Sequence, residues 1–352
     1  MIIVKKTNVA VFFGGHSSEY SVSLQSAYAV IRNLDSKKYR PIPVGISSTG
    51  QWFFFTGDVE KIKQDNWQND ADCVSAVLSP NRGERKLLLL RPNTVEEIVI
   101  DIALPILHGK NGEDGTVQGL IALSGIPLAG CGILSSALCM DKERAHKLVG
   151  AAGVRVPKSI VLRSPSHIDG ATTFSREVGF PLFVKPVKSG SSYGITKVLS
   201  VQDLLPAITT AFQYDNEVTL EENIEGFEVG CAVLGTDHLI TGEVDEIELS
   251  QGFFDFTEKY TLKTSAIHVP ARIPTEKAEE IKETAKHVYR TLGCSGFARV
   301  DLFLTPSGEI VFNEVNTIPG FTEHSRYPGM MKAAGFPFCM VLDQIIEQAV
   351  IQ

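Results

Sequence analysis

Runs of apolar residues, each ending in a glycine-rich or polar turn, recur along the chain and predict its strands and helices. NVAVFFGG at 8–15 predicts a buried strand that enters a glycine turn, and 16–34 has helical apolar spacing with Ser17 or Ser18 as N-cap. VIDIALPIL at 99–107 predicts a second strand before the loop HGKNGEDG and the helix TVQGLIALSG. This alternation predicts a parallel α/β domain over roughly the first 120 residues, with ligands at the carboxyl ends of its strands.

The pattern of the middle third indicates a second unit. Residues 135–152 predict one helix that stops at Gly153, and VPKSIVL predicts a short strand. PLFVKPVKSGSSYGITKVLS reads as strand, Gly/Ser loop and strand, which is a hairpin rather than a strand-to-helix phosphate loop. After a helix around 201–213, the strands VTLEE, EVGCAVLG and LITGEVDEIEL lie close together in sequence and predict one antiparallel sheet.

The last third contains a break in periodicity that predicts a lid. Residues 250–265 combine Gly252 with polar residues in no regular spacing, which is typical of a lid loop. We then expect a helix near 275–292, the strands GFARVDLFL and EIVFNEVN, a Pro-Gly loop and two terminal helices.

Composition narrows the class of protein. A chain of 352 residues fits two or three domains, and 43% hydrophobic with 21% charged residues is typical of a globular protein. The net charge of -8 argues against nucleic acid as a partner. No apolar run is long enough for a membrane span and residues 1–10 lack a signal-peptide pattern, so we expect no membrane partner and a cytoplasmic location. The six cysteines have no metal-binding spacing, and we expect most to be small buried side chains.

The segment RVDLFLTPSGEIVFNEVN predicts a metal site. Side chains two apart on a strand share a face, so Arg299 accompanies Asp301, and Glu314 accompanies Asn316. If the strands pair across TPSG, Asp301, Glu314 and Asn316 supply hard oxygen ligands for Mg²⁺ on nucleotide phosphates. The alternative is a hairpin with a polar solvent face, but the glycine-containing loop TIPGFTEHSR that follows favours the metal site.

Two lysines and several carboxylates are candidates for nucleotide binding. Lys185 ends a strand before a Gly/Ser loop of backbone donors, and Lys142 stands at a helix start, where a nearby phosphate would explain a cation. Of the carboxylates Glu221, Glu222 and Glu228, one could accept from an adenine amino group and another from ribose hydroxyls. Solvated surface charge is the alternative for all of these residues.

With these segments in order, the chain resembles the D-alanine:D-alanine ligase family of the ATP-grasp superfamily, essentially from end to end. The resemblance rests on FFGGHSSEYSVSLQSA, LHGKNGEDGTVQG, SSALCMDK, VKPVKSGSSYG, EKY, ARVD and NEVNTIPGFTEHSRYP. It implies an α/β fold in which a Rossmann-like parallel N-terminal domain (1–125) precedes a two-part ATP-grasp fold. The implied subdomains are central (126–215) and C-terminal (216–352), the latter with the lid at 250–265.

The resemblance also implies a role for each motif residue. Asp301, Glu314 and Asn316 would hold magnesium, two ions being expected and Mn²⁺ a possible substitute. Arg299 and the Gly320 amide would stabilise the oxyanion. Glu19 would bind the ammonium of the first D-amino acid near His108, Ser325 would meet the carboxylate of the second, and Glu19, Ser191 and Tyr260 would form the network that closes the lid. The implied ATP-binding residues are Lys142, Lys185, Glu221, Ile224, Glu228 and Lys259.

Several positions depart from the housekeeping pattern of this family. Arg326, Leu128, Asn223 and Ser189, with the segment GFFDFTEKYTLK, resemble the vancomycin-resistance ligases that make D-alanyl-D-serine. Tyr260 argues against the D-lactate type, in which a histidine is usual in that region. We expect Arg326 to donate to the hydroxyl of a second-substrate D-serine, because a guanidinium has donors only, with Phe254 as an apolar wall. The alternative is that Arg326 points outward and pairs with a residue such as Glu323.

Three other functions remain open from the sequence. An ordinary D-alanine:D-alanine ligase shares the chemistry, a non-catalytic ATP sensor would not need Arg299, and another ATP-grasp enzyme such as a carboxylase would not need the FGGHSSE block. The expected partners are ATP, D-alanine and D-serine, and the resemblance implies a homodimer.

Overall fold

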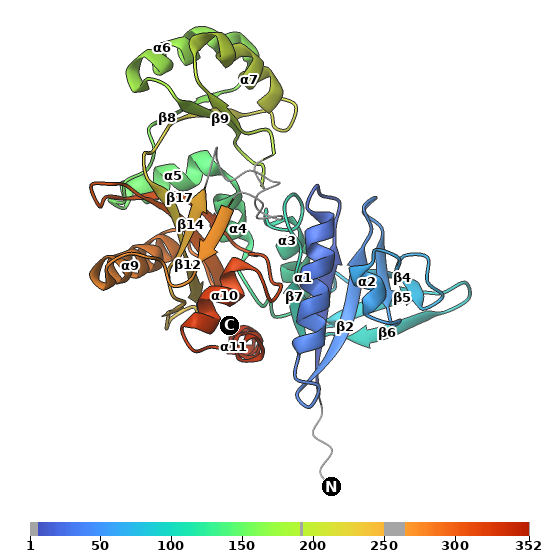
Figure 1. The fold of residues 1–352 in the computed structure, drawn as a ribbon. Helices are drawn as coiled ribbons and strands as arrows, with labels where there is room; N and C mark the ends of the chain where they lie inside the picture. The colour runs from blue at the N-terminus through green and yellow to red at the C-terminus, as the bar shows by residue number, and fades with distance from the viewer. Residues whose placement is uncertain (1–5, 191–192, 250–264, 352) are drawn as a thin grey trace.

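The computed structural model describes residues 6–190, 193–249 and 265–351 (Figure 1). The predicted lid therefore lies outside the described residues, apart from Ser265, which begins strand β15 (Ser265–His268). Ser191, Phe254, Lys259 and Tyr260 also lie outside them.

The N-terminal domain is built on a sheet of order β6-β5-β4-β3-β2-β1-β7. Only β2-β1-β7 is parallel, and the remaining pairs are antiparallel, so the prediction of a parallel domain is wrong for the outer half of the sheet. Short connections such as 47–51 explain this, because a parallel pair needs a long crossover. The strands are β1 (Thr7–Gly14), β2 (Tyr39–Ile46), β3 (Trp52–Phe55), β4 (Cys73–Leu78), β5 (Lys86–Leu90), β6 (Val95–Val99) and β7 (Ile102–Pro105).

The helices of this region begin and end at positions that differ from the prediction. α1 (Tyr20–Asn33) has Glu19, not Ser17 or Ser18, at its N-cap position; α2 (Glu60–Lys63) and α3 (Thr116–Ser124) follow. The single helix predicted over 135–152 is two helices, α4 (Ile133–Met140) and α5 (Lys142–Ala151). Asp141 separates them because its extended backbone ends α4 while its carboxylate accepts from the Arg144 amide and caps α5.

The central unit is an antiparallel sheet of order β10-β9-β11-β8, packed against α6 (Ile168–Val178) and α7 (Leu204–Ala211) (Figure 1). Its strands are β8 (Ser159–Leu162), β9 (Leu182–Pro186), β10 (Thr196–Val198) and β11 (Val218–Glu222). The predicted hairpin is confirmed, since β10 pairs antiparallel with β9. The expectation that VTLEE shares a sheet with the next strands is wrong: β11 pairs with β8 and β9 instead.

The C-terminal unit carries a sheet of order β15-β14-β12-β16-β17, with β13 paired to β12. β16 and β17 pair antiparallel as predicted, with Asp301 opposite Glu314 and Arg299 opposite Asn316. The strands are β12 (Phe227–Leu234), β13 (Ile240–Thr241), β14 (Asp245–Leu249), β16 (Phe297–Leu304) and β17 (Ile310–Asn316), and the helices are α9 (Thr275–Thr291), α10 (Arg326–Ala333) and α11 (Phe338–Ile351).

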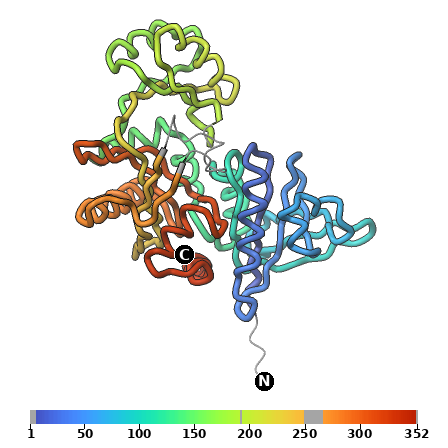
Figure 2. Tube along the Cα trace, viewed as in Figure 1, coloured from blue at the N-terminus to red at the C-terminus, as the bar shows by residue number. Residues whose placement is uncertain are grey.

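One hydrophobic core joins the two ends of the described chain. Val9 and Val30 of the N-terminal domain pack in the same buried cluster as Leu342 and Ile345 of α11. Figure 2 shows α11, in red, next to the N-terminal domain in blue. The last helix is therefore part of the first domain's core.

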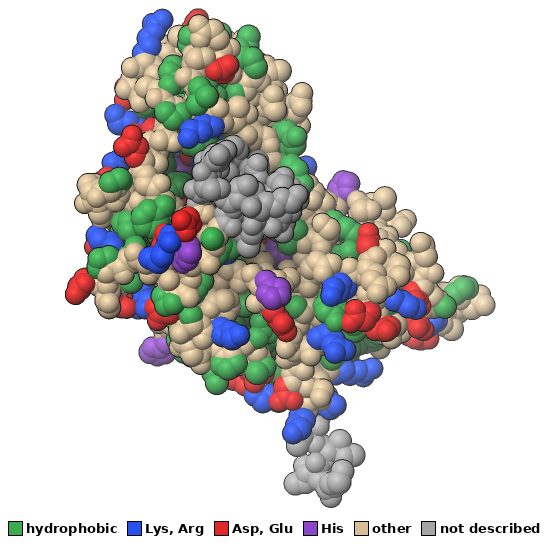
Figure 3. Space-filling model, in the orientation of Figure 1, with side chains coloured by type: hydrophobic (Ala, Val, Ile, Leu, Met, Phe, Trp, Pro, Cys, Tyr) green, Lys and Arg blue, Asp and Glu red, His purple; other side chains and the backbone are tan. Residues whose placement is uncertain are grey.

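The surface charges and the burial of the cysteines can be compared with what the composition predicts. Acidic and basic side chains are interspersed on the face in Figure 3. Within residues 6–190, 193–249 and 265–351, no helix is both long and apolar enough to cross a membrane. Cys131, Cys139, Cys231 and Cys294 are buried, which confirms the expectation for most of the cysteines.

Candidate active site

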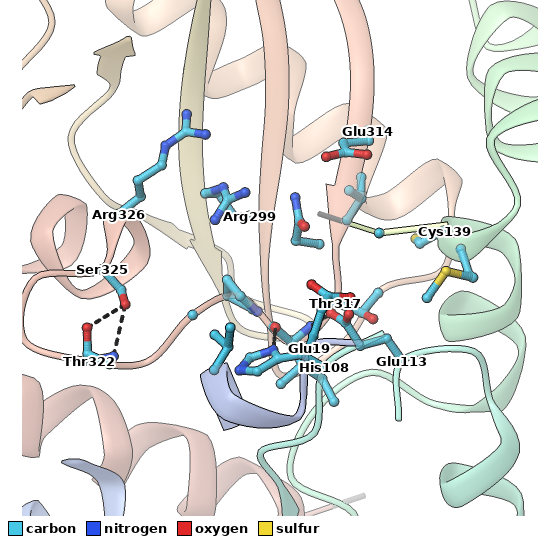
Figure 4. A pocket seen from close by; sticks show the side chains of 18 of the residues that line it. Glu19, His108, Glu113, Cys139, Arg299, Glu314, Thr317, Thr322, Ser325 and Arg326 are labelled. Carbon is cyan, nitrogen blue, oxygen red and sulfur yellow. Dashed lines mark hydrogen bonds between the residues drawn. The ribbon is translucent and has the colours of Figure 1, made fainter. Parts of the chain in front are cut away.

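A cavity of about 530 Å³ lies where the three units meet (Figure 4). The N-terminal domain contributes Glu19 from the start of α1 and the loop after β7. The central region contributes Lys142 and the Ser189–Gly190 backbone. The C-terminal unit contributes β16, β17 and the loop that leads into α10. From the described residues, the predicted site residues that line it are Glu19, His108, Lys142, Arg299, Glu314, Asn316, Gly320, Ser325 and Arg326.

The predicted metal residues meet at the β16–β17 pair. Asp301 is almost fully buried and accepts from Arg299 Nε and Nη2, each at 2.7 Å. Asn316 Nδ2 donates to the same carboxylate at 2.8 Å. Glu314 lies directly across the strand pair from Asp301, and its Oε2 is 3.5 Å from Lys142 Nζ. Strand pairing therefore gathers two carboxylates and one amide.

These donors suit a hard cation. Carboxylate and amide oxygens are the ligands that Mg²⁺ prefers. The described part of the chain holds no cluster of three or more His, Cys, Asp or Glu side chains suited to a metal. In this structure Arg299 neutralises Asp301 and Asn316 donates a hydrogen bond to it, so a bound cation would replace hydrogen bonds rather than enter an unpaired acidic cluster.

Of the candidate nucleotide residues, Lys142 contacts the Gly/Ser loop, and Lys185 and Glu221 form an ion pair in the central sheet. Lys142 begins α5, is buried, and donates from Nζ to the Ser189 carbonyl at 2.9 Å, so it reaches the Gly/Ser loop. Lys185 on β9 pairs with Glu221 on β11 at 2.6 Å, across adjacent strands of the central sheet. Burial opposes the charge on Glu221, yet Lys185 holds the pKa of this carboxyl below its usual value. Ile224 lies in the connection between β11 and β12.

Glu19 is wedged between two glycines of different units. A Cβ at Gly109 would come within 2.4 Å of Glu19 Oε2, and one at Gly190 within 2.6 Å. Gly109 also has φ of +72°, which L side chains rarely adopt. Both glycines are therefore needed for this carboxylate to reach the cavity wall.

His108 lines the same cavity as Glu19, and both of its ring nitrogens face protein groups. Its Nδ1 lies 2.9 Å from the Ile318 carbonyl and its Nε2 lies 3.2 Å from Ser26 Oγ. Burial lowers the pKa of His108 to about 4. Both ring nitrogens thus have partners inside the protein, and the place of His108 near the ammonium of the first substrate stays a prediction.

Glu113 is a cavity residue that the sequence reasoning missed. It stands in the loop HGKNGEDG, where only His108 was singled out. Its carboxylate accepts from the Gly109 amide at 2.7 Å and the Ile318 amide at 3.3 Å. Burial, and then the neighbouring Glu19 charge, raise the pKa of Glu113 to about 8. The acidic residue within a glycine-rich loop was the available signal.

Arg326 points inward, so the alternative in which it pairs with Glu323 at the surface is wrong. Its Nε and Nη2 donate to the two oxygens of Asp245 at 2.7 and 2.8 Å, and Nη1 donates to Glu228 at 2.8 Å. Nη1 also lies 3.3 Å from Asp301. These bonds engage three of the five N–H groups of the guanidinium.

Asp245 is therefore a second residue that the sequence did not reveal. It is fully buried on β14, 81 positions before Arg326, and no local spacing connects the two. Gly230 on β12 makes room for the pair, since a Cβ there would approach Arg326 Nη2 to 2.5 Å. The Ser325 hydroxyl accepts from the Thr322 amide at 3.0 Å and lies 2.8 Å from Thr322 Oγ1 (Figure 4).

Comparisons with known proteins agree with this arrangement. Two family models match: D-ala D-ala ligase N-terminus over residues 8–131 and D-ala D-ala ligase C-terminus over residues 148–347. A putative D-alanine–D-lactate ligase of Streptomyces coelicolor is 46% identical, and the match covers 98% of each chain. The vancomycin B-type resistance protein VanB of Enterococcus faecalis is 45% identical over 99% of each chain.

A solved structure gives the same result. The VanG D-Ala:D-Ser ligase from Enterococcus faecalis superimposes with a TM-score of 0.91 and 55% identity, covering 98% of this chain and 100% of that one. The predicted fold class, an N-terminal α/β domain followed by a two-part ATP-grasp fold, is confirmed by these likenesses, although the N-terminal sheet is mixed. The chain therefore belongs to the D-alanine:D-alanine ligase family and is a ligase of the D-Ala-D-X kind.

Proposed function

We propose that this ligase joins D-alanine to D-serine through a D-alanyl phosphate, and that the product supplies modified peptidoglycan precursors that confer vancomycin resistance. The observation that carries the D-serine assignment is the buried Arg326–Asp245 pair at the cavity wall. The similarity to a D-Ala:D-Ser ligase and to a vancomycin-resistance protein supports it.

The reaction needs an activated carboxylate, because a carboxylate is a poor electrophile. In the proposed first step the γ-phosphoryl group of ATP moves to a carboxylate oxygen of the first D-alanine, which gives an acyl phosphate and ADP. In the second step the amine of D-serine attacks the acyl carbon, the C–N bond forms, and the C–O bond to phosphate breaks as the amine loses a proton. Positive charge beside the developing negative charges is what the site must supply.

The chain's own residues provide that charge. Lys142 and Lys185 would bind the nucleotide phosphates, with Glu221, Ile224, Glu228 and Lys259 around the rest of the ATP. Asp301, Glu314 and Asn316 would hold two Mg²⁺ ions, for which Mn²⁺ could substitute, and the bound metal would neutralise phosphate charge. Arg299 lines the cavity beside Asp301, where it could stabilise the tetrahedral oxyanion together with the Gly320 amide.

Different cavity residues would bind the first and the second substrate. Glu19, buried between Gly109 and Gly190, would receive the ammonium of the first D-alanine. Ser325 would receive the carboxylate of the second substrate, with Arg326 next to it. Asp245 and Glu228 fix the plane of the guanidinium, and in this proposal its remaining N–H groups would donate to the serine hydroxyl. A methyl group could not accept from these donors.

The remaining proposals follow from the substrates and the family. We propose a cytoplasmic location, where ATP and cell-wall precursors are made, and a homodimer, which light scattering of the purified protein would test. Ser191 and Tyr260, outside the described residues, would join Glu19 in the network that closes the lid, and Phe254 would form the apolar wall beside the serine hydroxyl.

Product analysis tests the second substrate directly. The enzyme is incubated with ATP, Mg²⁺ and an equimolar mixture of D-alanine, D-serine and D-lactate, and the products are separated by mass spectrometry. Hydrogen bonds to charged groups contribute about 1.5 to 3 kcal/mol, so D-alanyl-D-serine should exceed D-alanyl-D-alanine roughly tenfold to hundredfold. Equal or greater D-alanyl-D-alanine would favour the housekeeping function, and a depsipeptide product would favour the D-lactate function.

A charge-preserving variant isolates the role of Arg326. Arg326→Lys keeps a cation beside Asp245 but loses the planar fork, so the preference for D-serine over D-alanine should fall about tenfold. Arg272→Lys is the matched control, because Arg272 also pairs with two carboxylates, Glu246 and Glu248, at an exposed position. If both variants keep the wild-type ratio of kcat/KM values, Arg326 does not select the substrate.

A further inference from the structure

Three hydrogen bonds from the N-terminal domain hold the loop that contains Gly320. This loop, residues 317–322, leaves β17 directly after Asn316. The Ile318 amide donates to Glu113 at 3.3 Å, the Ile318 carbonyl lies 2.9 Å from His108 Nδ1, and the Phe321 amide donates to Ser26 Oγ at 3.2 Å. The loop is thus fixed on both sides of Gly320 by side chains more than 200 positions away in sequence.

The hydrogen bonds define one arrangement of protons. A carbonyl oxygen only accepts, so His108 Nδ1 carries a proton and donates to Ile318. In the neutral ring Nε2 is then an acceptor, and the Ser26 hydroxyl donates to it at 3.2 Å. The Ser26 oxygen keeps lone pairs for the Phe321 amide. Burial keeps the pKa of His108 well below neutrality, in agreement with an uncharged ring.

Ser26 has no other evident reason to be polar. Its side chain is fully buried on α1, between Leu24 and Ala27 of the hydrophobic core. A buried hydroxyl is costly unless it is hydrogen-bonded, and both of the bonds described for Ser26 lead to His108 or to the Gly320 loop. Alanine would satisfy packing at this position as well.

We propose that Ser26, acting with His108, is a positioning residue that fixes the Gly320–Phe321 peptide and thereby aims the Gly320 amide at the oxyanion. The inference rests on the proposed function, in which this amide stabilises the tetrahedral intermediate. A peptide plane is rigid, so holding the Phe321 N–H fixes the orientation of the Gly320 carbonyl and limits rotation of Gly320 itself. Phe321 is also anchored by its ring, which packs against Phe297 and Tyr327.

The test compares Ser26→Ala and Ser26→Cys with the wild type, and Ser26→Thr and Ser124→Ala are the controls. Ser26→Cys preserves volume with a weak acceptor and covers the case in which alanine fails to fold. Ser124 is an equally buried serine whose hydroxyl bonds locally to Ile121, so Ser124→Ala is the matched control. ADP release with D-alanine and D-serine gives kcat and the KM for ATP, and calorimetry gives the affinity for ADP.

A misaimed oxyanion donor affects the transition state and leaves ground-state binding intact. Both Ser26 variants should lose about tenfold to hundredfold in kcat while the KM for ATP and the affinity for ADP change less than about threefold. A phosphinate analogue of the tetrahedral intermediate should lose affinity by the same factor as kcat/KM. Ser26→Thr, which restores the hydroxyl, should recover activity, and Ser124→Ala should keep the wild-type kcat.

Two outcomes overturn the inference alone. One is an active wild type whose Ser26 variants keep kcat within twofold. The other is a loss of kcat with unchanged phosphinate affinity, which would mean a general structural defect. A wild type that releases no ADP with any D-amino acid would instead overturn the proposed function, and the role of Ser26 with it.

Discussion

The buried charges of the predicted site residues are held in pairs, and Arg299 and Arg326 are the members of their pairs that line the cavity. Arg299 neutralises Asp301, Lys185 neutralises Glu221, and Asp245 neutralises Arg326. Breaking a buried pair by removing one partner is costly, because the other charge is left uncompensated. Substitutions at these positions therefore change stability as well as activity, and the two effects have to be measured separately.

Glu314 allows the cleanest test of the metal assignment. It lines the cavity on β17, and its side chain is more exposed than that of Asp301. Glu314→Gln should lower kcat by orders of magnitude because a charged ligand is lost, while the unfolding temperature stays close to the wild-type value because Lys142 keeps its hydrogen bond to the Ser189 carbonyl. ADP release is measured over a range of Mg²⁺ concentrations. Near-normal turnover at limiting Mg²⁺ would exclude Glu314 as a ligand.

Arg326→Leu should be a poor probe of specificity because it destabilises the fold. It leaves the fully buried Asp245 without the partner that contacts both of its oxygens. We expect a loss of about 3 to 5 kcal/mol in the free energy of unfolding, measured with denaturant. The double substitution Arg326→Leu with Asp245→Leu should recover part of that loss, since it removes both charges. Equal stability of the single variant and the wild type would show that Asp245 finds another partner.

Glu113 and His108 predict opposite dependences of stability on pH. The pKa of Glu113 is raised from 4.5 to about 8, so its contribution is complete below pH 4.5 and is lost as pH rises through 8. The pKa of His108 is lowered from 6.5 to about 4, so its contribution is complete above pH 6.5 and is lost as pH falls through 4. Of these two contributions, that of Glu113 is the one that changes above pH 6.5.

The variant Glu113→Gln isolates that contribution. Between pH 6.5 and 8 the free energy of unfolding of the wild type should fall by about 1 to 2 kcal/mol because of Glu113, and the variant should not show this fall. The unfolding temperature of the variant should therefore rise a few degrees relative to the wild type over this interval. Thermal unfolding of both proteins without substrates at a series of pH values measures the difference. A difference that is constant with pH would mean that Glu113 is already ionised at pH 6.5.

Sequence reasoning found the site residues that act within one strand or one loop. Arg299, Asp301, Glu314 and Asn316 were accessible because the short TPSG turn fixes which residues oppose one another. The partners Asp245 and Ser26 were not accessible, because they come from other strands and helices whose packing no local spacing encodes. The same limit explains why the contacts of His108 with Ser26 and Ile318 could not be predicted.

Among the secondary-structure elements, the break between α4 and α5 has the most direct link to the site. Asp141 accepts from the Arg144 amide at 3.0 Å, which starts α5 at Lys142 and directs that lysine toward the Ser189 carbonyl. Periodicity alone predicted one helix here, because the apolar spacing continues through 141. The acidic residue before a lysine was the sign of a new helix start.

Removing this cap should lower the stability of α5 and weaken nucleotide binding. Asp141→Ala should cost about 1 kcal/mol and raise the KM for ATP several-fold, since Lys142 would lose its fixed position. Asp141→Ser retains a capping oxygen and should restore most of the thermal stability. Unfolding temperatures and ATP kinetics of the two variants provide the measurement. Loss of stability with an unchanged KM would separate the cap from nucleotide binding.

The strand pairings that were predicted correctly join strands that are adjacent in sequence. The β9–β10 hairpin and the β16–β17 pair were predicted because their strands are adjacent in sequence. β11 and β12 are also adjacent, separated by residues 223–226, yet they belong to different sheets. Strand composition does not distinguish a turn that pairs two strands from one that carries the chain into the next unit.

For the molecule as a whole, the core shared by the N-terminal domain and α11 determines how the parts unfold. Leu342 and Ile345 are buried against residues of β1 and α1. Ile345→Ala should lower the free energy of unfolding by about 2 to 5 kcal/mol. Both tryptophans, Trp52 and Trp67, lie in the N-terminal domain, so their fluorescence reports this loss although the substitution is nearly 280 positions away.

A surface position on the same helix provides the control. Met340→Ala removes an exposed side chain from α11 and should leave the tryptophan transition within about 0.5 kcal/mol of the wild type. An Ile345→Ala protein with an unchanged tryptophan transition would show that the N-terminal domain is stable without the helix.

The shared core also has a consequence for the newly made protein. Val9 to Ile62 leave the ribosome early, but the α11 residues that complete their cluster, beginning with Val341, follow about 280 residues later. At translation rates of about 5 to 20 residues per second, this delay is roughly 15 to 55 s. During that time the apolar surface reserved for α11 has no partner on the nascent chain. The need of the nascent chain for chaperones should therefore depend on how soon α11 is synthesised. Slowing translation upstream of residue 338 should increase aggregation.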